Sequence, residues 1–186
     1  LMLAQRAESS LINSIEIVKQ AAQQANENYR PSSFLNITYC QHISLQQFAL
    51  SSISKYDLIV SHPPYFQDSL NSPDVQRTQA RHTDILSIEE LFLLSGNMLN
   101  NDGRISLIYP AADKDFILKE AEANGLFLSR LTNVFPTVDT DKPKRVLMEF
   151  SKNKKEPTIT NLVIENSRHV YSSDFINLVQ DFYLKM

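Results

Sequence analysis

The group of residues best suited to chemistry follows the apolar run Tyr56–Ser61 and consists of His62, Pro63, Pro64 and Tyr65. Two consecutive prolines fix two φ angles, remove two backbone N–H groups and hold the preceding residue extended. The carbonyl groups of residues 62 and 63 therefore lack local N–H partners and can point at a ligand, while the tyrosine offers a flat face on which a base could stack. A plain turn that ends a strand is the alternative, and the residues alone leave both open.

Two further side chains of this kind stand where predicted strands end. Glu16 ends the first predicted strand and His42 ends the second. In open α/β sheets ligands bind at the carboxyl ends of the strands, where an acid commonly accepts hydrogen bonds from ribose hydroxyls. This pattern favours a nucleotide-like ligand, although an exposed acid without a ligand explains Glu16 equally well.

Positive charge is concentrated in one part of the chain. The net charge is −3, but residues 142–155, KPKRVLMEFSKNKK, hold six Lys or Arg and one Glu. Such a run could contact phosphates, or it could simply be a solvated face. The polar stretch 66–83 also carries Arg77 and Arg81, has no helical period, and is predicted to be a long loop that is functional or mobile.

Several classes of protein are excluded by composition. Apolar residues make up 42% and charged residues 21% of 186 residues, as in an ordinary globular domain. The single cysteine, Cys40, allows no internal disulfide and suits the cytoplasm, where we expect the protein to lie. The four histidines are far apart, so we expect no metal site, and no apolar run is long enough to span a membrane.

The elements that must position these residues alternate along the chain. Helices are predicted over residues 1–8, 19–29, 87–99, 113–124 and 173–184. Strands are predicted over residues 13–17, 34–43, 56–61, 104–109, 126–135, 145–150 and 158–165. Alternating strands and helices predict an α/β fold with a mostly parallel twisted sheet, helices on both faces and an antiparallel hairpin at the edge. We expect one domain over residues 1–186.

Local signals support these boundaries. The continuous apolar run Tyr56–Ser61 is typical of a strand buried on both faces. Ser87 and Glu90 have the spacing of a capping box, residues 100–103 are predicted to form a turn, and Gly125 closes the helix before it.

The same residues carry a resemblance to a known family. A strand followed by Asn-Pro-Pro-Tyr is the signature of methyltransferases that act on amino or amide nitrogens, and this chain has SHPPY there. Segments 56–92 (YDLIVSHPPYFQDSLNSPDVQRTQARHTDILSIEELF), 130–137 (RLTNVFPT), 142–152 (KPKRVLMEFSK) and 170–186 (VYSSDFINLVQDFYLKM) resemble bacterial tRNA (adenine-N6)-methyltransferases that act on valine tRNA. The resemblance implies a Rossmann-like class I fold, S-adenosyl-L-methionine as cofactor and tRNA as partner.

The resemblance also implies roles for individual residues. The residues implied to form the catalytic site are His62, Pro63, Pro64 and Tyr65. The residues implied to bind the cofactor are Glu16, Ile17, His42 and Ile43. The residues implied to contact tRNA are Arg77, Arg81, Lys142, Lys144, Arg145 and Lys152.

This sequence departs from the family pattern at three places. The glycine-rich turn after the family's first strand would precede Leu1, so that strand and turn are expected to be missing here. His42 stands where the family usually has an acid, and His62 replaces the catalytic Asn. A neutral imidazole offers one acceptor nitrogen and a protonated one offers none, so we expect His62 to impair methyl transfer.

The departures leave other functions open. A non-catalytic RNA-binding domain on a decayed methyltransferase fold is one alternative. Methylation of a guanine amino group or a glutamine amide is another, but the resemblance of the tail at residues 170–186 argues against it. The oligomeric state does not follow from the sequence.

Overall fold

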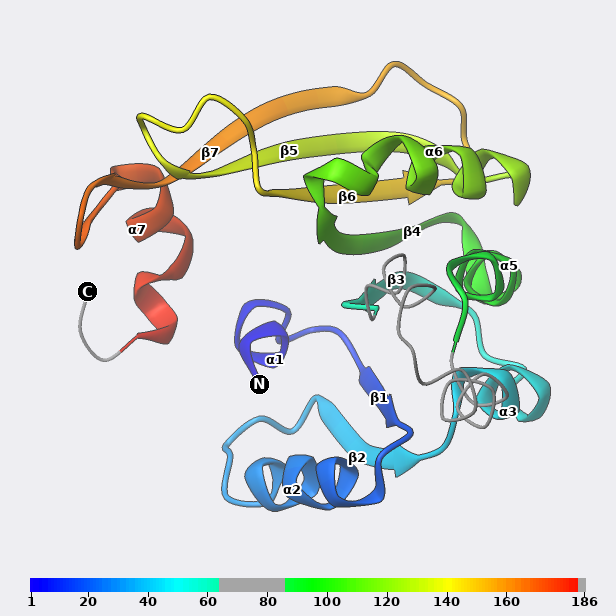
Figure 1. Cartoon of the computed structure of the whole chain (residues 1–186). Coiled ribbons are helices and arrows are strands. Elements are labelled where there is room, and N and C mark those ends of the chain that lie inside the picture. The colour runs from blue at the N-terminus through cyan, green and yellow to red at the C-terminus, as the bar shows by residue number, and fades with distance from the viewer. Residues whose placement is uncertain (64–85, 184–186) are drawn as a thin grey trace, which may run out of the picture. The chain divides into compact units, whose positions relative to one another are not determined.

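The computed structural model describes residues 1–63 and 86–183 and divides into two compact units, Leu1–Ile53 and Ser54–Met186 (Figure 1). The predicted loop over residues 66–83 lies outside the described residues. Four predicted site residues also lie outside them, namely Pro64, Tyr65, Arg77 and Arg81. The first unit carries the residues predicted to bind the cofactor, and the second carries those predicted to hold the target base and RNA.

The first unit is built on two parallel strands joined by a helix. Its elements are α1 (Met2–Arg6), β1 (Ile12–Glu16), α2 (Lys19–Tyr29), β2 (Ile37–His42) and α3 (Leu45–Ser51). In the register of the two strands, Ser14 lies opposite Cys40 and Glu16 opposite His42. Parallel strands need a crossover connection, and α2 supplies it. Because the pair is parallel, the carboxyl ends of both strands lie side by side.

Most element ends in this unit lie within two residues of the prediction, and there are two larger differences. Strand β2 begins three residues later than predicted, because Asn36 is in a turn where its side-chain amide donates to the carbonyls of Ala4 and Ala7 at 3.1 and 2.8 Å. Helix α3 was not predicted. Its start follows Ser44, whose hydroxyl accepts from the Gln47 N–H at 3.2 Å, and this Ser-x-x-Gln spacing is the signal that sequence reasoning missed.

The second unit is a six-stranded sheet with helices. Its strands are β3 (Tyr56–Ser61), β4 (Leu99–Pro110), β5 (Phe127–Thr137), β6 (Arg145–Ser151), β7 (Thr158–Ser167) and β8 (Val170–Tyr171). Its helices are α5 (Ile88–Met98), α6 (Lys114–Ala123) and α7 (Ser173–Val179), with short 3₁₀ turns η2 (Ala111–Asp113) and η3 (Gln180–Phe182). The strand order is β3-β4-β6-β5-β7-β8.

An antiparallel hairpin does stand at the edge of the sheet, but it is formed by β7 and β8, whereas the predicted pair of β5 and β6 lies inside the sheet. Strand β6 pairs antiparallel with both β4 and β5, whereas β3 pairs parallel with β4 and β5 parallel with β7. The physical reason is visible in the burial of β6. Val146, Met148 and Phe150 are at most 1% exposed, and a strand with such a face is stable between two neighbours.

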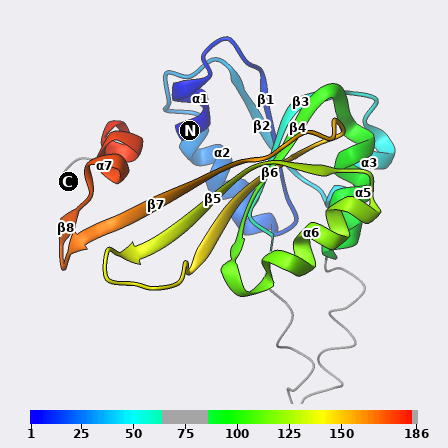
Figure 2. The same cartoon turned by 90° about the horizontal axis from the view of Figure 1, so that it is seen from above.

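Helices α5 and α6 lie beside each other and pack on the sheet (Figure 2). The Phe92 ring of α5 meets the Phe150 ring of β6 edge to face, with centroids 5.2 Å apart. The predicted capping box at Ser87 is present, with both hydrogen bonds formed. Gly125 has the predicted capping role, because it adopts a φ of +71° after α6 and donates its N–H to the Glu122 carbonyl.

Two local predictions need correction. Strand β3 is not buried on both faces, since Leu58 is 43% and Val60 is 52% exposed, and β3 stands at the end of the strand order. The predicted turn over residues 100–103 is a bulge within β4, where the register shifts between Tyr56 and Leu58 on β3. A Cβ on Gly103 would lie 2.6 Å from the Tyr56 carbonyl oxygen, so the bulge requires glycine.

The carboxyl-terminal helix is shorter than predicted. Helix α7 ends at Val179, and the 3₁₀ turn η3 replaces the rest of the predicted helix as far as Phe182. Among the described residues, no helix has the length and apolar character needed to cross a membrane.

Candidate functional site

The four residues predicted to bind the cofactor gather at the carboxyl ends of β1 and β2. Glu16 and His42 are register partners, and the Ile43 N–H donates to the Glu16 carbonyl at 3.1 Å. The His42 Nε2 lies 3.0 Å from the Ile17 carbonyl oxygen. Parallel pairing thus brings together two segments that are 25 residues apart in sequence.

The side-chain chemistry at this edge fits an adenosine group. One Glu16 carboxylate oxygen accepts from the Val18 N–H at 2.8 Å, and a carboxylate has further lone pairs for ribose hydroxyls. A carbonyl oxygen can only accept, so the hydrogen in the His42–Ile17 bond is on Nε2. In its neutral form the His42 ring then presents Nδ1 as an acceptor, which suits an amino group.

His62 and Pro63 directly follow β3. They lie where the parallel strands end, which we call the carboxyl edge of the six-stranded sheet; the opposite ends of these strands form its amino edge. Ser61, the last residue of β3, lies opposite Leu107 of the parallel strand β4. His62 is exposed and Pro63 is buried. The first half of the HPPY motif is therefore at the strand end where ligands bind in α/β sheets.

The predicted tRNA contacts that are described separate into two groups, because β6 lies between them. Arg145 begins β6 and lies opposite Pro110, near the carboxyl end of β4. Lys142, Lys144 and Arg145 are exposed there and share the edge of the sheet with His62. We call these three residues the carboxyl-edge cations.

Lys152 lies at the opposite edge of the sheet. Ser151, which ends β6, pairs with Arg104 near the amino end of the parallel part of β4. At about 3.3 Å per residue, β6 separates the two edges by roughly 20 Å. The Lys152 ammonium donates to the Leu99 carbonyl at 2.8 Å, just after helix α5. This lysine thus has a structural contact where the sequence indicated an RNA contact.

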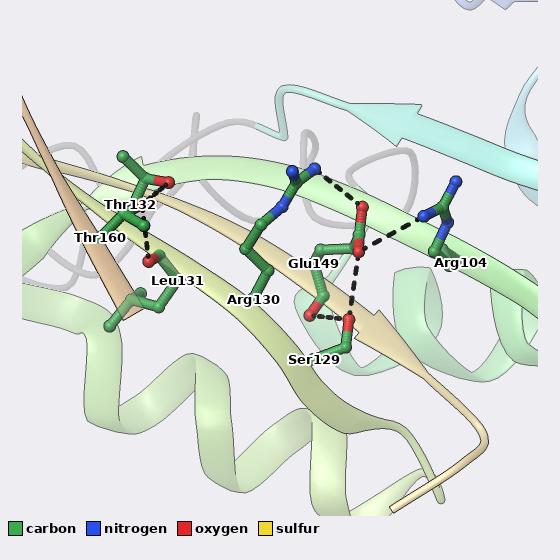
Figure 3. A network of polar contacts seen from close by, with 7 residues as sticks. All are labelled: Arg104, Ser129, Arg130, Leu131, Thr132, Glu149 and Thr160. Carbon is green, nitrogen blue, oxygen red and sulfur yellow. Dashed lines mark hydrogen bonds and ion pairs between the residues drawn. The ribbon is translucent and has the colours of Figure 1, made fainter. Parts of the chain in front are cut away.

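A network of charged residues that the sequence did not indicate occupies the same amino edge (Figure 3). The Glu149 side chain is 12% exposed, and its carboxylate lies 3.2 Å from the Arg130 guanidinium and 3.8 Å from that of Arg104. The Ser129 hydroxyl donates to the Glu149 backbone carbonyl at 3.0 Å. Since these residues come from three strands, only their pairing could reveal the network.

Comparisons with known proteins give independent evidence on the family of this chain. No family model matches the chain. The tRNA1(Val) (adenine(37)-N6)-methyltransferase of Parabacteroides distasonis is 41% identical over 187 residues, which cover 100% of this chain and 78% of the relative. The protein of the same name from Bacteroides fragilis is 43% identical over 189 residues, with the same coverage.

The chain belongs to this methyltransferase family. Membership confirms the resemblance found in the sequence, and the relatives' names favour adenine over the guanine or glutamine alternatives. Neither relative is named as a non-catalytic RNA-binding protein.

The fold of this chain is also found in a solved structure. The chain is similar to a predicted O-methyltransferase from Agrobacterium tumefaciens, with a TM-score of 0.71, 15% identity and coverage of 96% of this chain and 81% of the other. This likeness confirms the predicted α/β methyltransferase fold.

Proposed function

We propose that this protein transfers a methyl group from S-adenosyl-L-methionine to the N6 amino group of adenine 37 in tRNA1(Val). The observation that carries the proposal is the match to relatives of that name, 41% and 43% identical over the whole chain. Both units would then belong to one methyltransferase domain over residues 1–186. A tRNA substrate also makes the cytoplasm the place of action.

The adenosine half of the cofactor would be held at the ends of β1 and β2. Glu16 supplies a carboxylate for the ribose hydroxyls, and His42 supplies an acceptor for the adenine amino group. Ile17 and Ile43 adjoin them at the same edge. When bound, S-adenosyl-L-methionine supplies a methyl group on a positively charged sulfur.

The target adenine would be held by the HPPY motif. An adenine amino group is a poor nucleophile because its lone pair is delocalised into the ring, so the site must orient its two N–H bonds. The Pro63 carbonyl can accept one bond, and His62 can accept the other only while its imidazole is neutral. Tyr65 would stack on a base taken out of the tRNA loop. Positioning and electrostatic stabilisation would supply most of the catalysis.

The anticodon-loop phosphates would be contacted near this motif. The carboxyl-edge cations Lys142, Lys144 and Arg145 are exposed at the edge of the sheet that carries His62. Arg77 and Arg81 would add charge from the chain segment that follows the motif. The contact at Leu99 argues that Lys152 takes a smaller part in RNA binding than its sequence context suggested.

Methylation assays test both the function and the role of His62. The full-length protein is expected to methylate a tRNA1(Val) transcript that has adenine at position 37. A transcript that has guanine at that position is expected to remain unmethylated. Replacing His62 with Asn restores an acceptor that does not depend on protonation, so we expect the rate to rise by about tenfold or more.

His169→Asn is the matched control, because His169 is an exposed histidine in the turn between β7 and β8. Its rate is expected to equal that of the unaltered protein. Equal rates with His or Asn at residue 62 would contradict the catalytic role of this residue. Tight tRNA binding without any methylation by either protein would favour the non-catalytic alternative.

A further inference from the structure

Asn26, in the second half of helix α2, covers with its side chain the side of strand β2 that faces away from β1. The residue is 8% exposed. Its Nδ2 donates to the Cys40 carbonyl at 2.9 Å, and its Oδ1 accepts from the Cys40 N–H at 2.7 Å. The amide thus makes the two hydrogen bonds that a neighbouring strand would make, which is one way to protect a sheet edge.

This pairing is specific for one register of β2. In a strand, the N–H and C=O of one residue point to the same side, and successive residues alternate. The Ile43 N–H bonds to Glu16 of β1, so Ile43 and Gln41 direct their backbone groups toward β1, whereas Cys40 directs its groups away. A slip of β2 by one residue would offer Asn26 neither group and would turn His42 to the other face.

Hydrogen bonds connect helix α2, and its N-cap residue Val18, to the two strands. Near its start the Val18 N–H binds the Glu16 carboxylate at 2.8 Å, and at its end the Tyr29 hydroxyl donates to the Ser14 hydroxyl at 3.3 Å. The Asn26–Cys40 pair lies between them, two residues before His42. It is the buried attachment of the three, and unmade buried hydrogen bonds are costly.

We propose that Asn26 is a positioning residue for cofactor binding, which holds β2 in the register that places His42 beside Glu16. The inference rests on the proposed function, because it assigns Asn26 to the adenosine end of that site. Asn26 acts through β2 and does not touch the ligand.

The test uses Asn26→Ala, with Asn28→Ala as the control because Asn28 is exposed on the same helix. Calorimetry with S-adenosylhomocysteine measures the dissociation constant of each full-length protein, and tRNA1(Val) binding is measured in parallel. We expect Asn26→Ala to weaken binding of the nucleoside ligand by about tenfold, with tRNA affinity changed less than about twofold and no change in the control.

The only cysteine of the chain gives a second readout that does not depend on a variant. Cys40 is 2% exposed, so alkylation of its thiol reports local opening of β2. In the unaltered protein, saturating S-adenosylhomocysteine is expected to slow this alkylation, because a ligand that binds the closed strand opposes opening. Asn26→Ala is expected to speed alkylation without the ligand.

The possible outcomes distinguish a failure of the Asn26 proposal from a failure of the proposed function. If S-adenosylhomocysteine binds both variants as tightly as the unaltered protein, or binds without protecting Cys40, the role of Asn26 is overturned. An equal loss of nucleoside and tRNA binding, matching a loss of folded protein, would also overturn it and leave Asn26 a purely structural residue. If the unaltered protein binds no S-adenosylhomocysteine and methylates no tRNA, the proposed function fails, and the inference fails with it.

Discussion

The two ends of strand β6 carry similar basic residues in different surroundings. At its start, Lys142, Lys144 and Arg145 are exposed on the edge of the sheet that carries His62. At its end, Lys152 donates to the Leu99 carbonyl, and Lys154 lies 3.4 Å from Glu122 and 5.1 Å from the centre of the Phe127 ring. We call Lys152, Lys154 and Lys155 the amino-edge lysines.

This comparison shows why a basic run in a sequence is a weak indication of one binding surface. All six cations lie within 14 residues, but an extended strand between them places the two groups at opposite edges of the sheet. Under the proposed function, the group at the same strand ends as His62 would contact the same substrate as the HPPY motif. In the other group, Lys152 and Lys154 contact a backbone carbonyl and a carboxylate within the protein, whereas in the first group Arg145 donates to the carbonyl of the neighbouring Lys144.

The largest expected effect distinguishes the two groups directly. Replacing all three carboxyl-edge cations with Ala is expected to weaken tRNA1(Val) binding by about tenfold or more and to reduce the slope of log affinity against log salt by about 3, since each phosphate contact contributes about one. Filter binding over a series of salt concentrations measures both quantities.

The matched control replaces the three amino-edge lysines with Ala and removes the same formal charge. Its salt slope is expected to stay close to that of the unaltered protein. An equal change of slope in the two triple variants would refute the distinction and restore the single patch that the sequence suggested.

A smaller effect is expected on stability from Lys152→Met. This change keeps the apolar stem but removes the ammonium that binds the Leu99 carbonyl after helix α5, where a cation also suits the helix dipole. We expect the free energy of unfolding to fall by about 1 kcal/mol. Urea denaturation measures it.

Lys154→Met is the control, because its contacts with Glu122 and Phe127 are exposed and such pairs contribute about 0–1 kcal/mol. The tRNA affinity is expected to be unchanged in both variants. A loss of tRNA affinity in Lys152→Met without a loss of stability would indicate instead that Lys152 contacts RNA.

The smallest expected effect concerns the arginines at the amino edge. Glu149→Gln removes the negative charge between Arg104 and Arg130 and keeps the size of the side chain (Figure 3). If tRNA does not reach this edge, its affinity stays within about twofold of the original despite the added net charge. A clear gain in affinity would mean instead that ion pairing, and not position, keeps these arginines from binding RNA.

Local elements were the most predictable part of this protein. Helix α2 and strand β3 have the predicted ends, and the capping box at Ser87 is formed as expected. These features depend on neighbours a few residues apart, so the sequence contains nearly all the information for them. The positions of the HPPY motif and of the residues proposed to bind the cofactor were predictable for a related reason, since a strand end is a local feature.

Pairing between distant segments was less predictable. The inside position of β6 depends on which strands it joins, and the Glu149 network and the Asn26–Cys40 bonds depend on the same choices. Such contacts join residues that are 14 to 45 positions apart, and no local sequence pattern indicates them.

The sequence by itself determined the family, most of the helices and strands, and the identity of the residue that follows β3. A histidine at residue 62 changes the number of hydrogen-bond acceptors whatever the fold around it. Only the tertiary structure decided which cations share an edge with that histidine and which are bound to backbone and carboxylates. The reason is geometric, because a strand carries its two ends to opposite sides of a sheet while keeping them close in sequence.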